Sequence, residues 1–290
     1  MARCLVTGHK GYIGSRLVDR LEGLGHDVKG VDLQEGDDIL DGLNQFIDFR
    51  PEYVFHLACI PRVAYSVEQP VLTMINNVIA TSIVLDFANK MKVKRVIYSG
   101  SSSVVGNGDG PASPYGLQKL VSELESKLYT SLYGLDTVTL RYFNVYSPCQ
   151  KAEGPYATAV ANFMQFIRDG KNPFITGDGE QRRDMAHLED VVSANIAAME
   201  RTTNFNGATY DIGTGSNISL NKIKEIALEF FPHVEFDYAP PRHGDVFSTK
   251  ANITPFMDES SWSPMNEIDS GIRNCFAKLQ EELENKNEEN

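Results

Sequence analysis

The stretch "TGHKGYIGS", residues Thr7 to Ser15, decides the fold. It lies between a short apolar run, "RCLVTG", and a helix-like stretch that we expect over Ser15–Leu24. Three glycines at this spacing permit a tight strand-to-helix turn, close approach of a pyrophosphate, and close packing of helix on strand. The stretch therefore predicts a dinucleotide-binding turn, whose cofactor contacts would be Gly8, Gly11, Tyr12, Ile13 and Gly14.

An acidic residue, Asp32, ends the next β-rich run, "DVKGVDL". It follows the glycines by about 20 residues, where a carboxylate can accept hydrogen bonds from the adenosine ribose diol. Because an acid there repels a 2′-phosphate, the sequence predicts NAD and not NADP as cofactor. Two interpretations stay open for Asp38 in "DDI": it lies near the adenine amino group with Ile39, or it is a loop carboxylate in water.

Short β-rich runs alternate with helix-like periods as far as Ser147. This alternation predicts an α/β protein with a doubly wound parallel Rossmann sheet and helices on both faces. The expected helices include Leu43–Phe49, Val71–Lys90 and Tyr156–Asp169. The rest of the chain predicts a smaller, interleaved C-terminal substrate lobe. We expect an NAD-binding domain over 1–147, to which 185–213 returns, and a substrate-binding lobe over 148–184 and 214–290.

Composition and charge argue against several classes of partner. The 290 residues carry 27 basic and 39 acidic side chains, a net charge of −12, which disfavours nucleic acid and anionic membranes. The four cysteines form no CxxC or Cys/His cluster, so we expect reduced thiols and no metal. The first apolar run leads directly into the glycine loop. We therefore expect no signal peptide, no apolar stretch long enough to span a membrane, and a cytoplasmic location.

The carboxyl ends of the expected strands carry small and hydroxyl-bearing residues. Ligands bind beyond these ends in a doubly wound sheet. One end is "HLA", which places Leu57 and Ala58 at the cofactor, and another is "SGSSS", Ser99–Ser103.

The segment "SPYGLQK" adds a candidate proton-transfer pair. Ser113 is a good N-cap and Pro114 suits the first helical position, so Tyr115 and Lys119 lie one turn apart on one face. A free tyrosine has a pKa near 10, and a nearby cation and a helix N-terminus both favour the phenolate. The pair is thus arranged to exchange a proton near neutral pH.

In order and spacing these motifs resemble the extended short-chain dehydrogenase/reductases, in particular the UDP-glucose 4-epimerase-like members of the nucleotide-sugar epimerase/dehydratase branch. The resemblance runs from "TGHKGYIGS" to "SWSP" and includes "INNV", "SGSSSVVG", "RYFNVY", "QRRD" and "RHGD". It implies that Tyr115 is the catalytic acid/base, that Lys119 binds the nicotinamide ribose and lowers the tyrosine pKa, and that Ser101 hydrogen-bonds the reacting sugar hydroxyl. It further implies cofactor binding by Asn76 and substrate binding by Ser102, Asn144, Arg183 and Arg242. The two arginines match those that hold the diphosphate, for which guanidinium groups give bidentate contacts.

The residues after Ser101 distinguish members of this branch. Dehydratases and uronate decarboxylases carry an acid there, whereas this chain has Ser102 and Ser103. The resemblance therefore implies NAD-dependent epimerisation of a nucleotide-diphosphate sugar, at C4 of a UDP-hexose, through a transient 4-keto intermediate. It also implies a homodimer, formed through the helices Val71–Lys90 and Pro114–Tyr133.

Three departures keep other functions open. Val105 replaces the tyrosine of a "VYG" motif, the loop Gly106–Pro114 is short, and the stretch from Asp32 to His56 is contracted with no clear third strand. The contraction is similar to that of NAD(P)H-dependent nucleotide 4-keto-sugar reductases, which are the second candidate. A non-catalytic NAD-binding regulatory protein is the third, because fold does not fix function, although such relatives usually lose the Tyr–Lys pair.

Overall fold

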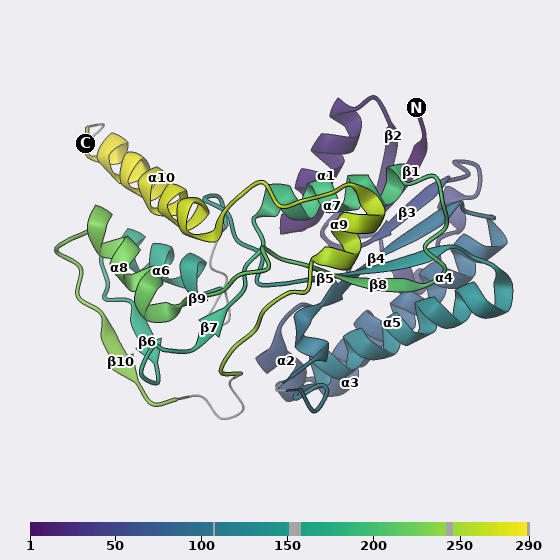
Figure 1. Cartoon of the computed structure of the whole chain (residues 1–290). Helices are drawn as coiled ribbons and strands as arrows, with labels where there is room; N and C mark the ends of the chain where they lie inside the picture. Colours follow the sequence, from purple (N-terminus) through teal and green to yellow (C-terminus); the bar gives the residue numbers. More distant parts are fainter. Residues whose placement is uncertain (107, 151–157, 242–245, 289–290) are drawn as a thin grey trace. The chain divides into compact units, whose positions relative to one another are not determined.

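The computed structural model describes residues 1–106, 108–150, 158–241 and 246–288, with side chains as far as 286. The chain divides into two compact units (Figure 1). The first unit comprises Met1–Tyr142, Val191–Ile212 and Thr254–Ser263, and the second comprises Phe143–Asp190, Gly213–Ile253 and Pro264–Asn290.

The first unit is built on a six-stranded sheet in which every pair of neighbours is parallel, as the alternating pattern predicts. From one edge to the other its strands are β2 (Asp27–Val31), β1 (Arg3–Thr7), β3 (Tyr53–His56), β4 (Arg95–Ser101), β5 (Thr137–Tyr142) and β8 (Ala208–Ile212). The residues of β1, β4 and β5 are almost continuously buried, which is typical of a sheet covered on both faces.

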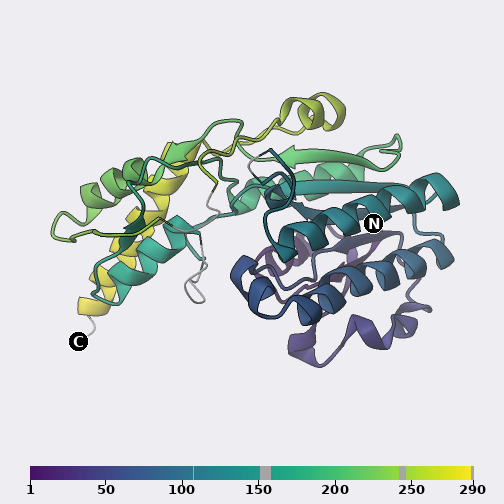
Figure 2. The same cartoon turned by 90° about the horizontal axis from the view of Figure 1, so that it is seen from below.

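Helices cover both faces of this sheet (Figures 1 and 2). One face carries α1 (Tyr12–Gly23) and α7 (Leu188–Glu200). The other carries α4 (Ala80–Lys90) and α5 (Pro114–Tyr133), which contact each other along the sheet. Shorter helices complete the unit: α2 (Val63–Glu68), α3 (Pro70–Met74), the π-helical turn η4 (Ile75–Ile79), the 3₁₀ turn η5 (Ser102–Val104) and α9 (Thr254–Ser260).

The connection from β2 to β3 contains three 3₁₀ turns: η1 (Leu33–Glu35), η2 (Ile39–Asp41) and η3 (Asn44–Phe46). The helix predicted over Leu43–Phe49 is therefore wrong. Leu43 and Phe46 are both buried in the core under the sheet, so their spacing reflects a tight turn that inserts two apolar side chains. Within the described residues, β2 has β1 as its one strand neighbour and forms the edge of the sheet.

The segments α3, η4 and α4 form one continuous helical run, Pro70–Lys90. By length and composition this run could cross a membrane, which corrects the expectation that no stretch is long and apolar enough. Half of its most apolar window is buried inside the protein, and core helices pass the same test.

The second unit packs three helices around its own apolar core: α6 (Ala159–Arg168), α8 (Leu220–Phe230) and α10 (Ile268–Glu288). The predicted helix Tyr156–Asp169 begins in the structure at Ala159, after the N-cap Thr158, while positions 156 and 157 lie outside the described residues. Two small sheets accompany the helices. One pairs β6 (Phe174–Thr176) with β10 (Asp237–Ala239), and the other pairs β7 (Arg182–Arg183) with β9 (Ile218–Ser219).

Candidate active site

The glycine loop joins β1 to α1 as the sequence predicts. A Cβ at Gly14 would overlap the carbonyl oxygen of Gly8, so this helix can approach the loop only with glycine there. The helix is capped by Gly11, which has no side chain to occupy the first amides of α1. Tyr12 and Ile13 form the first turn. Backbone amides in the first turn of a helix point along its axis and suit a pyrophosphate, so the loop fits the dinucleotide that the sequence predicts.

Asp32 follows β2 and faces the glycine loop. Its carboxylate accepts hydrogen bonds from the backbone amides of Lys10 (3.0 Å) and Gln34 (2.9 Å). These two bonds fix the orientation of the carboxylate. Since a carboxylate has about four acceptor sites, they leave capacity for a ribose diol.

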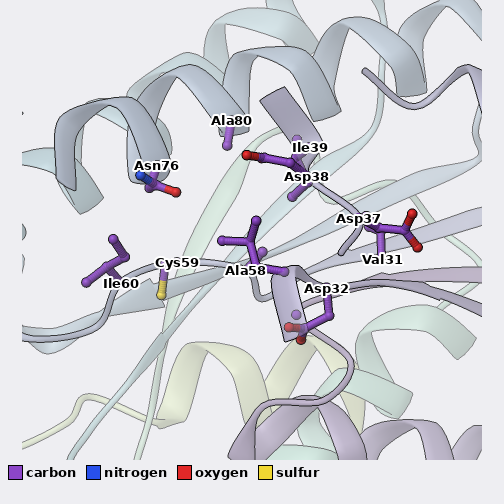
Figure 3. Close-up of a pocket in the computed structure, with 12 residues that line it drawn as sticks. Val31, Asp32, Asp37, Asp38, Ile39, Ala58, Cys59, Ile60, Asn76 and Ala80 are labelled. Atoms are coloured by element: carbon purple, nitrogen blue, oxygen red, sulfur yellow. The ribbon is translucent and has the colours of Figure 1, made fainter. Parts of the chain in front are cut away.

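A pocket of about 490 Å³, including its open mouth, lies at the carboxyl ends of β1, β2 and β3 (Figure 3). Six of its lining residues are predicted cofactor contacts: Gly8, Asp32, Asp38, Ile39, Ala58 and Asn76. Asp38 caps η2, where its carboxylate accepts a hydrogen bond from the Leu40 amide at 2.9 Å. Leu57 precedes the pocket residue Ala58 and donates its amide to the Thr7 carbonyl at 3.2 Å.

The sequence did not identify the other six lining residues: Val31, Leu33, Asp37, Cys59, Ile60 and Ala80. Most are small or apolar and have no chemical signature beyond their place after a strand or on a helix. Figure 3 shows Asn76 and Ala80 on a helix across the pocket from Asp32. A mostly apolar cavity with a few fixed carboxylates is typical of a site for an adenosine group.

A buried polar network supports the floor of this pocket, and the sequence did not identify it either. The Asn77 side chain accepts from the Ile60 amide (2.7 Å) and donates to Gln118 (2.8 Å). The two ring nitrogens of His56 are hydrogen-bonded to the hydroxyls of Thr7 (2.7 Å) and Thr81 (2.9 Å). Burial and, second to it, the positive charge of Lys119 together lower the pKa of His56 to about 3, so this imidazole is neutral.

The predicted proton-transfer group assembles at the start of α5, with Ser113 as N-cap as expected. Tyr115 is buried, and its backbone amide donates to the Ser66 hydroxyl at 3.0 Å. The Lys119 ammonium donates to the Ser99 carbonyl at 2.7 Å and lies 6.0 Å from the centre of the Tyr115 ring. Ser101, at the end of β4, hydrogen-bonds Tyr115 and accepts from the Ser103 hydroxyl at 2.9 Å. The structure therefore brings together Ser101, Tyr115 and Lys119.

Lys119 lowers the pKa of Tyr115 as the resemblance implies, but the net pKa lies above the ordinary value of tyrosine and not near neutral pH. Burial raises the pKa of Tyr115 to about 12, while the Lys119 charge and the Ser101 hydrogen bond act in the opposite direction. The net pKa is raised because the loss of water around the phenolate outweighs the effect of one nearby cation. Burial also disfavours the Lys119 ammonium, but Cys59, Tyr98 and Tyr115 raise its pKa above the ordinary value. Lys119 therefore stays charged.

The predicted substrate residues are spread over both units. In the first unit, Ser102 lies half-buried in η5. In the second unit, Asn144 donates to the Asp184 carbonyl at 2.7 Å, and Arg183 in β7 donates to the carbonyls of Arg182 (3.0 Å) and Phe247 (3.4 Å). Arg242 lies outside the described residues.

The described part of the chain contains no group of three or more His, Cys, Asp or Glu side chains arranged to hold a metal. All four cysteines are unpaired.

A parallel sheet with a glycine turn, an acid after its second strand and a Ser–Tyr–Lys group defines a dinucleotide-dependent enzyme fold. The family model "NAD dependent epimerase/dehydratase family" matches residues 4–213, and the chain belongs to this family. It is 32% identical over 319 residues to the UDP-glucose 4-epimerase of Mycolicibacterium smegmatis, covering 99% of this chain and 100% of that one.

Two solved structures illustrate the likeness in three dimensions. The UDP-glucose 4-epimerase of Thermotoga maritima with UDP-glucose has a TM-score of 0.87 at 32% identity, covering 97% of this chain and 99% of that one. MoeE5 in complex with UDP-glucose and NAD has a TM-score of 0.86 at 30% identity, with the same coverage. The predicted family and fold class are confirmed.

Proposed function

We propose that this protein is an NAD-dependent UDP-sugar epimerase that inverts C4 of a UDP-hexose. The observation that carries the proposal is the group of Ser101 with the buried Tyr115 and Lys119, in the same unit as a pocket that fits an adenosine group. Relatives that align over nearly the whole chain are named UDP-glucose 4-epimerases, and solved neighbours hold a UDP-sugar or NAD.

The cofactor would be held by the glycine loop, by Asp32 and by Lys119. When bound, NAD supplies the redox chemistry, taking a hydride from the sugar carbon and returning it to the other face. Tyr115 takes the proton of the sugar hydroxyl when the carbonyl forms and gives it back when the hydroxyl is restored. Ser101 holds that hydroxyl against Tyr115, and the charged Lys119 stabilises the phenolate that is present before the first proton transfer and is formed again after the second.

We propose that the second unit supplies most of the substrate contacts, through Asn144, Arg183 and Arg242, with Ser102 from the first unit. Arg183 is supported at two backbone carbonyls, which hold a guanidinium in a fixed orientation. Such a group suits bidentate binding of a diphosphate. We propose that the two units correspond to the predicted NAD-binding domain and substrate-binding lobe, except that Thr254–Ser263, which the prediction placed in the lobe, belongs to the first unit.

A homodimer is the second part of the proposal. Two rows of exposed apolar side chains lie on contacting helices of the first unit: Val71, Leu72, Ile75 and Ile79 on α3 and η4, and Leu117, Val121, Leu124, Leu128 and Leu132 on α5. Apart from the adjacent Val71 and Leu72, neighbours in each row are three or four residues apart, which keeps the row on one helical face. An exposed apolar surface of this extent is typical of a protein interface, and a second copy of the chain would cover it.

We also propose a cytoplasmic location, which is consistent with the unpaired cysteines and with small-molecule partners.

The reductase and regulatory alternatives make different predictions about cofactor consumption. Ser102 and Ser103 offer no acid for elimination or decarboxylation, and an epimerase regenerates its NAD in every cycle. The test is to incubate the holoenzyme with UDP-glucose, UDP-galactose and their N-acetylated counterparts, and to follow products by NMR and the reduced cofactor by absorbance. We expect interconversion of C4 epimers without net change in NADH. Stoichiometric oxidation of NADH by a 4-keto sugar would favour a reductase, and NAD binding without turnover of any sugar would favour a regulatory protein.

A further inference from the structure

An ion pair and a contact with a histidine ring join the glycine loop to the turn after β2, and the proposed reaction uses neither. Glu35 in η1 pairs through one carboxylate oxygen with the Lys10 ammonium (2.8 Å) and through the other with the His9 ring (3.0 Å). Lys10 also donates its backbone amide to Asp32. A cation in the glycine loop is therefore held directly beside the acid that we expect to bind the adenosine ribose.

The His9 ring lies against β2 and contacts the Glu35 carboxylate. A Cβ at Gly30 would overlap the His9 ring, so β2 has a glycine where the ring crosses it. The His9 side chain is 11% exposed, whereas Lys10 and Glu35 are each 45% exposed. Glu35 is consequently anchored on a buried ring and reaches outward to a lysine that water can also reach.

We propose that Glu35 is a second determinant of cofactor choice, because it holds Lys10 and so withholds a cation that a 2′-phosphate would otherwise attract. The inference rests on the proposed NAD binding. Asp32 repels a 2′-phosphate directly, but the neighbouring Lys10 has the opposite sign and would partly cancel that repulsion. Pairing with Glu35 neutralises Lys10, so the repulsion by Asp32 stays uncompensated. Exposed ion pairs contribute little to stability, so the pairing can be removed without loss of the fold.

The test measures the dissociation constants of NAD and NADP by calorimetry on cofactor-stripped protein. For Glu35→Gln we expect NADP to bind about fivefold to tenfold more tightly, the effect of one freed cation near a phosphate, while NAD changes by less than about twofold. The gain should disappear in the double variant Glu35→Gln, Lys10→Met. Glu52→Gln is the matched control, because Glu52 pairs with Arg3 and Lys94 near the amino ends of the strands and its loss changes the net charge equally.

Two outcomes would overturn the inference. One is an unchanged ratio of NADP to NAD affinity in Glu35→Gln, and if both nucleotides bind equally more weakly, Glu35 has only a bracing role in the turn. The other is a gain that persists without Lys10. Wild-type protein that binds neither nucleotide would overturn the proposed function as well, whereas normal NAD binding with an unchanged ratio would overturn this inference alone.

Discussion

Replacement of Lys119 by methionine separates two roles that the cation is expected to have. Methionine keeps most of the length and volume of the lysine side chain but removes its charge. In the structure the ammonium lies 6.0 Å from the centre of the Tyr115 ring, and Tyr115 is buried. If Lys119 stabilises the phenolate, its loss must make Tyr115 a weaker acid.

The size of this effect follows from Coulomb's law. At that separation and an effective dielectric constant of about 20, two unit charges interact by about 3 kcal/mol, which equals about two pKa units. Burial already raises the pKa of Tyr115 to about 12, so the variant moves further from neutrality. Because the phenolate is the form that accepts the sugar proton, the rate rises with pH up to the pKa. At any pH below both pKa values, Lys119→Met should oxidise sugar about 100-fold more slowly than wild type.

The assay is the first-turnover reduction of enzyme-bound NAD after mixing with a UDP-hexose, followed by absorbance across the neutral and alkaline range. NAD is kept saturating, since Lys119→Met also loses the expected ribose contact. Tyr115→Phe should retain no pH-dependent turnover. Lys90→Met serves as the control, because Lys90 is an exposed lysine of the same unit that pairs with Asp86.

The decisive result is the position of the rising limb of the rate–pH profile. A displacement of about two pH units supports electrostatic activation of Tyr115. If the rising limb of the Lys119→Met profile coincides with that of the wild type at saturating NAD, electrostatic activation of Tyr115 is refuted, whether or not the plateau rate is lower. Lys119 would then have only a cofactor-binding role.

Three further predictions concern stability, pocket occupancy and assembly. The unfolded-state imidazole of His56 titrates near 6.5 and the folded one near 3, so acid favours the unfolded state. Because of His56, the free energy of unfolding should therefore fall by about 2 kcal/mol as the pH is lowered from neutral to 5. His56→Gln should lack this pH dependence in urea titrations. NAD at tenfold its dissociation constant should slow maleimide labelling of the pocket residue Cys59 about tenfold and leave the exposed Cys149 unaffected, as read by peptide mass spectrometry; equal protection of both would contradict the pocket assignment. Leu128→Glu should convert a dimer to a monomer in light scattering, whereas a wild-type monomer would exclude the proposed interface.

The sheet and the proton-transfer group could be predicted because their signals are local. Glycine spacing, an acid after the second strand and the sequence "SPYGLQK" each follow from the backbone geometry of one turn or one helix start. The family resemblance gave the role of Ser101, and the structure places this residue against Tyr115.

The network under the pocket could not be predicted because it joins residues far apart in sequence. Asn77 supports Ile60 and meets Gln118, and these pairs are separated by 17 and 41 positions. "INNV" contains two adjacent asparagines, and nothing in the letters indicates which faces the pocket. The π-helical turn η4 places Asn76 at the pocket and buries Asn77. The raised pKa of Tyr115 was missed for a related reason, since burial depends on the whole fold whereas Lys119 is visible one turn away.

The contraction between Asp32 and His56 shows how the pocket is retained when part of the sheet is missing. Within the described residues, no strand pairs with the outer edge of β2, and 3₁₀ turns connect it to β3. Two of these turns are capped by the pocket carboxylates themselves: Asp32 accepts from the Gln34 amide and Asp38 from the Leu40 amide. Each carboxylate is thus oriented by its own turn and needs no further strand beside it. Because these bonds are local, the sheet edge can shorten while both acids stay at the pocket, so the contraction by itself does not favour a reductase over an epimerase.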